Sequence, residues 1–143
     1  IVEDEPFVLE YNVRFGDPET QVILPLLKND ICDLFFKLSQ GEIEKIETDT
    51  GSTFCIVNAA PGYPENVQKN IPISLPDNKN NAYILHAGTA FDSQHKLVSN
   101  GGRVLNIVAK GQSKELARAE AYELNSKIQF LGRQFRHDIG LYE

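Results

Sequence analysis

The 143-residue sequence predicts an α+β protein, in which a strand-and-helix segment precedes a small, mostly antiparallel β domain with a C-terminal helix. Three observations support this fold class. Residues 7–15 alternate between apolar and polar side chains, which is typical of a strand with one buried face. Short β-rich runs at 53–60, 82–86 and 103–110 are separated by turns that contain Gly or Pro. A helical stripe of apolar residues follows them near the C-terminus.

The first helix is predicted directly after the strand at 7–15, which Gly16 ends. Asp17 is a candidate N-cap, and Pro18 suits the first helical position because its fixed φ matches a helix. Glu19 then lies at the positive end of the helix dipole. Pro25 should interrupt this helix, because proline removes a backbone donor and clashes with the preceding turn.

A second helix should start at Asn29 or Asp30 as N-cap and end near Gly41. Its apolar face is formed by Ile31, Leu34, Phe35 and Leu38. The residues after it are polar and weakly patterned, and they end in a turn-like cluster at 49–52. We therefore predict a domain boundary here, with residues 1–48 in one unit and 49–143 in another.

The β domain should end in a helix over 113–131. Its buried stripe consists of Ala117, Ala121, Leu124, Ile128 and Leu131. Gly132 is the expected C-cap, since glycine readily adopts the left-handed conformation that ends many helices.

Composition narrows the classes of partner. Fourteen basic and 20 acidic residues give a net charge of -6, which disfavours nucleic acid and anionic membranes as main partners. No apolar run approaches the roughly 18 to 20 residues that span a bilayer. Cys32 and Cys55 each lie in an apolar run, so we expect buried thiols and a reducing, cytoplasmic location. The chain contains no Met, and we therefore expect a piece of a longer protein.

Glu10, Asn12 and Arg14 form the strongest candidate site. Spacing of two on a strand would place them on one face, roughly 6 to 7 Å apart. A carboxylate and an amide oxygen suit Mg²⁺, and a guanidinium suits phosphate. The alternative is an exposed strand face with a Glu–Arg pair that contributes about 1 kcal/mol or less. Spacing alone favours that alternative.

Gly101, Gly102 and Arg103 also allow two interpretations. Two glycines can bring backbone N–H groups close to an anion, with the arginine adding charge. They can equally form a turn between two strands, with the arginine exposed to solvent.

The run EYNVRFGDPETQ at 10–21 closely resembles the motif near the end of the ATP-grasp domain of the phosphoribosylamine–glycine ligase family. The resemblance continues in order through the family's C-terminal domain, with GYP at 62–64, HAGTA at 86–90, NGGRVL at 100–105 and RHDIG at 136–140. The Glu-x-Asn-x-Arg core is shared with other ATP-grasp ligases and carboxylases, whereas RFGDPE and NGGRV are more specific. By this resemblance, 1–48 would be the end of an ATP-grasp domain and 49–143 the ligase C-terminal domain.

The resemblance implies roles for six residues. Glu10 and Asn12 would hold Mg²⁺ or Mn²⁺ at the phosphates of ATP, and Arg14 would be catalytic, stabilising the transferred charge. Asp17 and Glu19 would lie near the substrate, although helix capping explains them equally well. Arg103 would contact a phosphorylated sugar.

The implied reaction joins glycine to 5-phosphoribosylamine at the expense of ATP, early in purine biosynthesis. The implied partners are these small molecules and the remainder of the same ATP-grasp enzyme, with no nucleic acid or membrane. A glycine-rich loop and upstream lysines are missing from the sequence, so we expect the chain alone to be inactive. Two alternatives stay open: another ATP-grasp ligase or carboxylase subunit, and a non-catalytic binding or assembly module.

Overall fold

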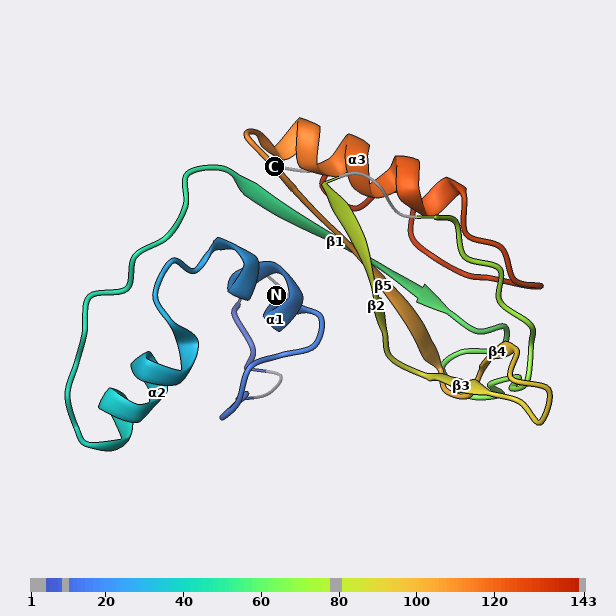
Figure 1. The fold of residues 1–143 in the computed structure, drawn as a ribbon, viewed down its shortest axis with the longest axis horizontal. Coiled ribbons are helices and arrows are strands. Elements are labelled where there is room, and N and C mark those ends of the chain that lie inside the picture. The colour runs from blue at the N-terminus through green and yellow to red at the C-terminus, as the bar shows by residue number, and fades with distance from the viewer. Residues whose placement is uncertain (1–4, 9–10, 78–80, 142–143) are drawn as a thin grey trace.

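The computed structural model describes residues 5–8, 11–77 and 81–141. Its main sheet has three antiparallel strands in the order β1 (Ser52–Ala59), β5 (Arg103–Gly111) and β2 (Ala82–His86). A second sheet pairs β3 (Thr89–Phe91) with β4 (Leu97–Ser99). Helix α3 (Lys114–Ser126) packs on the three-stranded sheet (Figure 1). The predicted α+β class, with antiparallel sheets and a C-terminal helix, is therefore confirmed.

The core lies between α3 and one face of this sheet. The register aligns Ile56 of β1 and Ile84 of β2 with Ile107 of the central strand, so the three isoleucines form a row across the sheet. Ile56 and Ile107 are fully buried, as are Ala117 and Ala121 on the facing side of α3. Burying an isoleucine contributes roughly 1.5–3 kcal/mol, so this row is a major source of stability. The small alanines allow the helix to approach the sheet closely.

The opposite face of the sheet is covered by the N-terminal segment. Helix α1 (Glu19–Ile23) and the 3₁₀ turn η1 (Leu24–Leu26) contact β1, and α1 also contacts β5, on the side away from α3 (Figure 1). Pro25 lies in η1 and ends the α-helical geometry, as predicted. Helix α2 (Ile31–Ser39) follows, and its predicted cap is confirmed: the Asp30 carboxylate accepts hydrogen bonds from the backbone N–H groups of Cys32 and Asp33.

Two predictions near the N-terminus are wrong. The described part of residues 7–15 forms no strand, because no other described strand lies beside it to complete its hydrogen bonds. Val13, one of the apolar residues expected on a buried face, is 97% exposed. Helix α1 also begins at Glu19 with Pro18 as N-cap, so Asp17 does not cap it. The Asp17 carboxylate is engaged in other contacts, described below.

The C-terminal helix is shorter than predicted. It ends at Ser126 with Lys127 as C-cap, so Gly132 does not cap it. Backbone pairing between Gln129 and Ser74 draws the chain out of the helix immediately afterwards. Leu131 is consequently 81% exposed, whereas the rest of the predicted stripe is buried as expected.

The two cysteines differ in exposure. Cys32 is exposed on α2, which makes the prediction of a buried thiol wrong there, and Cys55 is partly buried in β1. In the described ranges, no helix combines the length and the apolar character needed to cross a membrane.

Candidate functional site

A polar pocket of about 260 Å³ lies where residues 11–26, which we call the N-terminal arm, meet the start of β5. Its walls are formed by Asn12, Arg14, Gly16, Asp17, Pro18, Glu19 and Arg103. The structure thus brings five of the six predicted site residues together, although Arg103 is distant from the others in sequence. Glu10 lies outside the described residues.

Arg103 and Asp17 form the wall that joins the two parts of the chain. The Arg103 Nη2 atom lies 3.0 Å from Asp17 Oδ2, and Nη1 donates to the Asp17 backbone carbonyl at 3.0 Å. The second carboxylate oxygen of Asp17 accepts from Gln21 Nε2 at 2.7 Å. Because Asp17 is fixed on both sides, it holds the guanidinium at the pocket. These contacts use two of the five N–H donors of Arg103.

Gly101 and Gly102 form the turn before Arg103, where close packing favours residues without a side chain. A Cβ atom on Gly102 would lie 2.5 Å from Cδ2 of the Tyr63 ring, and one on Gly101 would lie 3.0 Å from Cα of Gly88. The turn interpretation of these glycines therefore accounts for their place in the sequence.

Gly16 and Glu19 shape the other side of the pocket. A Cβ atom on Gly16 would collide with the Glu19 carboxylate, which lies directly against the glycine. Thr20 also closes this turn, because its backbone N–H and its hydroxyl both donate to the Gly16 carbonyl, at 3.0 and 2.7 Å. Glycine is the residue that allows the carboxylate to occupy this position.

Asn12 and Arg14 line the same pocket although the segment that carries them is not a strand. Arg14 Nη1 donates to the Phe15 carbonyl at 2.9 Å. Of the two predicted metal ligands, the structure describes Asn12, whose amide oxygen is a ligand that Mg²⁺ accepts, and the two guanidinium groups suit phosphate or carboxylate. The described lining therefore suits an anionic ligand, with the Asn12 amide available beside it.

The negative charge of Asp17 also affects the pKa of Cys55 in β1. Burial raises the pKa of the Cys55 thiol to about 12, and the Asp17 carboxylate adds to this rise by disfavouring the thiolate. Cys55 is paired with Val108 on the sheet face that α1 covers. The arm is thus positioned over this face.

A second cavity, of about 380 Å³, shares the Arg103 wall. Its remaining lining is largely apolar: Val57, Ala59, Tyr63, Gln134, Phe135 and Arg136. Sequence reasoning missed this cavity, because its residues come from three distant segments with no common spacing. Backbone hydrogen bonds between Ala59 and Gln134, at 2.8 and 3.0 Å, bring the C-terminal segment to the edge of β1.

The fold and the polar pocket define the chain as a small α+β domain with an N-terminal arm that builds an oxygen- and guanidinium-lined site on its sheet. The family model for the phosphoribosylglycinamide synthetase C domain matches residues 53–142, and the chain belongs to this family.

Curated relatives are similar in sequence over nearly the whole chain. A phosphoribosylamine–glycine ligase of Leptospira interrogans is 42% identical over 139 residues, covering 95% of this chain and 32% of the relative. A bifunctional purine biosynthetic protein of Dictyostelium discoideum is 39% identical over 138 residues, covering 93% of this chain and 17% of that protein. The crystal structure of the phosphoribosylamine–glycine ligase of Thermotoga maritima superposes with a TM-score of 0.81 at 41% identity, covering 95% of this chain and 34% of that one. The chain thus spans about a third of the length of the ligases that it matches.

Proposed function

We propose that the chain is the C-terminal part of an ATP-dependent carbon–nitrogen ligase that joins glycine to 5-phosphoribosylamine in purine biosynthesis. Residues 1–48 would be the end of its ATP-grasp domain and 49–143 its C-terminal domain. The observation that supports this most directly is the convergence of Asn12, Arg14, Asp17, Glu19 and Arg103 on one pocket. The names of the relatives support the same reaction.

The chemistry requires three reactants that each carry an anionic group to meet: ATP, the glycine carboxylate and the sugar phosphate. The glycine carboxylate attacks the γ-phosphorus of ATP to form glycyl phosphate and ADP, and the sugar amine then displaces inorganic phosphate to form the amide. Positioning and charge neutralisation matter more in phosphoryl transfer than a general base does. A pocket lined by two guanidinium groups suits this requirement.

Each pocket residue then has a role. Arg14 stabilises negative charge on the transferred phosphoryl group. Arg103 binds the sugar phosphate with the N–H donors that Asp17 does not use, and Asp17 orients it. Glu19 lies on the substrate side, where its carboxylate can accept a hydrogen bond from an amine.

Glu10 and Asn12 would hold Mg²⁺ (or Mn²⁺), which when bound neutralises phosphate charge. The rest of the ATP site, including a glycine-rich loop and lysines, would come from other parts of the full-length protein. We therefore expect the 143-residue chain alone to have no ligase activity.

The test is turnover by the full-length protein. With ATP, glycine and 5-phosphoribosylamine, we expect ADP, phosphate and the glycine amide of the sugar amine in equal amounts. A panel of other carboxylates and amines should give far lower turnover. Preference for another pair would assign the chain to a different ATP-grasp ligase or carboxylase, and no turnover with any pair would support a non-catalytic module.

Arg103→Gln in the full-length protein tests the substrate side. We expect a higher KM for the sugar phosphate and an unchanged KM for glycine, because only the sugar substrate carries the phosphate that Arg103 would bind. Arg118→Gln provides a matched control: this guanidinium lies on α3 and donates to the carbonyls of His137 and Ile139. A sugar KM that responds equally to both changes would contradict the assigned role.

A further inference from the structure

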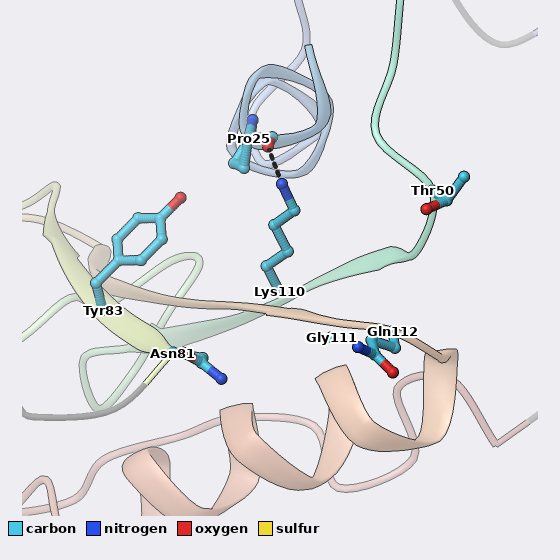
Figure 2. Close-up of a pocket in the computed structure, with 7 residues that line it drawn as sticks. All are labelled: Pro25, Thr50, Asn81, Tyr83, Lys110, Gly111 and Gln112. Carbon is cyan, nitrogen blue, oxygen red and sulfur yellow. Dashed lines mark hydrogen bonds between the residues drawn. The ribbon is translucent and has the colours of Figure 1, made fainter. Parts of the chain in front are cut away.

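Lys110 lies at the end of β5 opposite to Arg103, and its side chain extends from the sheet toward η1 (Figure 2). Its Nζ atom donates to the Pro25 carbonyl at 3.2 Å and also contacts the Asp49 carboxylate. The second oxygen of Asp49 lies 3.3 Å from Lys28 Nζ. The hydrogen bond from Lys110 and that from Lys28 lower the pKa of Asp49, which keeps the carboxylate charged.

The contacts of Lys110 lie at the base of a loop of the chain that contains α2 and is closed by backbone hydrogen bonds between residues 26–28 and 47–49. Residues 26–28 run out toward α2, and residues 47–49 return from it. Their backbones pair: Lys28 N–H donates to the Glu47 carbonyl at 2.9 Å, and Asp49 N–H donates to the Leu26 carbonyl at 2.8 Å. The Lys110 ammonium group therefore contacts Pro25, directly before the outgoing residues, and Asp49 in the returning ones.

A cavity of about 440 Å³ surrounds this group, with Thr50, Asn81 and Tyr83 among its walls (Figure 2). An anion would be a poor ligand here. The ammonium already has two oxygen partners, and the Asp49 carboxylate offsets its charge. The contacts of Lys110 thus join segments of the chain and do not form an anion site.

The two cations of β5 hold opposite ends of the same segment. Arg103 fixes Asp17, just before α1, and Lys110 fixes Pro25, in η1. They are seven positions apart on the strand, or roughly 23 Å between their Cα atoms at about 3.3 Å per residue. The α1–η1 segment therefore has one side-chain attachment to the central strand near each of its ends.

We propose that Lys110 is a positioning residue, which fixes the η1 end of the α1–η1 segment and thereby the placement of the 12–19 pocket wall. This role rests on the proposed function, because it concerns the site at which ATP phosphates would bind. Loss of the η1 attachment lets the arm shift while the Arg103 attachment persists. A displacement of about 1 Å can cost as much as 100-fold in rate.

The experiment uses the full-length protein with Lys110→Met, which keeps the length of the stem and removes the ammonium. Lys110→Arg restores a cation, and Lys127→Met is the matched control. Lys127 Nζ lies 2.7 Å from an oxygen of Glu123, and both side chains are exposed at the end of α3, so that change removes an ion pair on the other side of the sheet from α1. Amide hydrogen exchange over 17–28 and steady-state kinetics are measured for each variant.

We expect Lys110→Met to speed exchange over 17–28 and to raise the KM for ATP roughly tenfold, since the arm binds phosphates in the ground state. Lys110→Arg should restore most of the KM, and Lys127→Met should change neither quantity. A smaller folded fraction would lower the apparent kcat and leave KM unchanged, which distinguishes positioning from simple destabilisation.

Wild-type exchange in Lys110→Met would overturn the proposal, as would faster exchange with an unchanged KM. Faster exchange throughout the chain would also overturn it, because it would indicate global loosening. Absence of ligase activity in the wild-type full-length protein would instead refute the proposed function. The exchange measurement would then still decide whether Lys110 holds the segment.

Discussion

Gly102 is a position at which one added methyl group should disturb the wall of the proposed site. In Gly102→Ala, the new Cβ atom would lie 2.5 Å from Cδ2 and 2.9 Å from Cε2 of Tyr63, and 3.4 Å from Cγ2 of Val67. The backbone at Gly102 lies outside the left-handed region, so alanine causes no strain there by itself. The expected penalty thus arises from the contact with the Tyr63 ring.

Overpacking of this kind typically costs about 1–3 kcal/mol. Tyr63 is 42% exposed, so its ring can move partly into solvent, and we expect the lower part of that range. The assay is urea unfolding of the chain, followed by circular dichroism, for Gly102→Ala in the wild-type background and in a Tyr63→Ala background. Without the ring, the methyl group should be neutral or should stabilise the chain by roughly 0.4–1 kcal/mol, because alanine restricts the unfolded state. An equal cost in both backgrounds would refute the packing argument.

Two further predictions concern buried groups. Asn58 Nδ2 donates to Asn125 Oδ1 at 2.8 Å, and both residues are almost fully buried. Asn125→Ala should therefore lower the free energy of unfolding by about 1–3 kcal/mol, because it leaves a buried amide without its acceptor. Ser126→Ala, at the exposed neighbouring position, is the control. Equally small effects of the two changes would contradict the prediction. The pKa of the Cys55 thiol is raised to about 12, so this thiol stays protonated at pH 9, where an ordinary thiol with a pKa of roughly 8.5 is mostly ionised. Iodoacetamide at pH 9 should accordingly modify exposed Cys32 and spare Cys55 until urea unfolds the chain, and similar rates in the folded protein would be the contrary result.

The sequence predicted correctly those elements that have a clear local signal: strands that contain a long apolar run, and a helix capped by a neighbouring residue. β1, β2 and β5 match the predicted strands closely, and Asp30 caps α2 through the two N–H groups that follow it. β3 and β4 have only three residues each, too few to show an alternating pattern. The alternation over 7–15 predicted which face of a strand would be buried, but it could not identify what would cover that face.

In the candidate site, too, contacts between residues close in sequence could be predicted, and contacts between residues far apart could not. Asn12 to Glu19 form one continuous run, so their proximity follows from the sequence. The ion pair of Arg103 with Asp17 joins residues 86 positions apart, and no spacing rule predicts it. The attachment of Lys110 to Pro25 joins residues 85 positions apart, and sequence reasoning gave no indication of it.

The most direct test of the proposed function is the metal dependence of turnover in the full-length protein carrying Glu10→Ala, with Glu42→Ala, an exposed carboxylate after α2, as control. Turnover of ATP and glycine should fall by roughly 100-fold or more in Glu10→Ala, because a ligand of the metal that neutralises phosphate charge is lost. The melting temperature should stay unchanged, and higher Mg²⁺ should restore part of the activity. Wild-type turnover with an unchanged Mg²⁺ requirement would contradict the role assigned to the arm and its pocket.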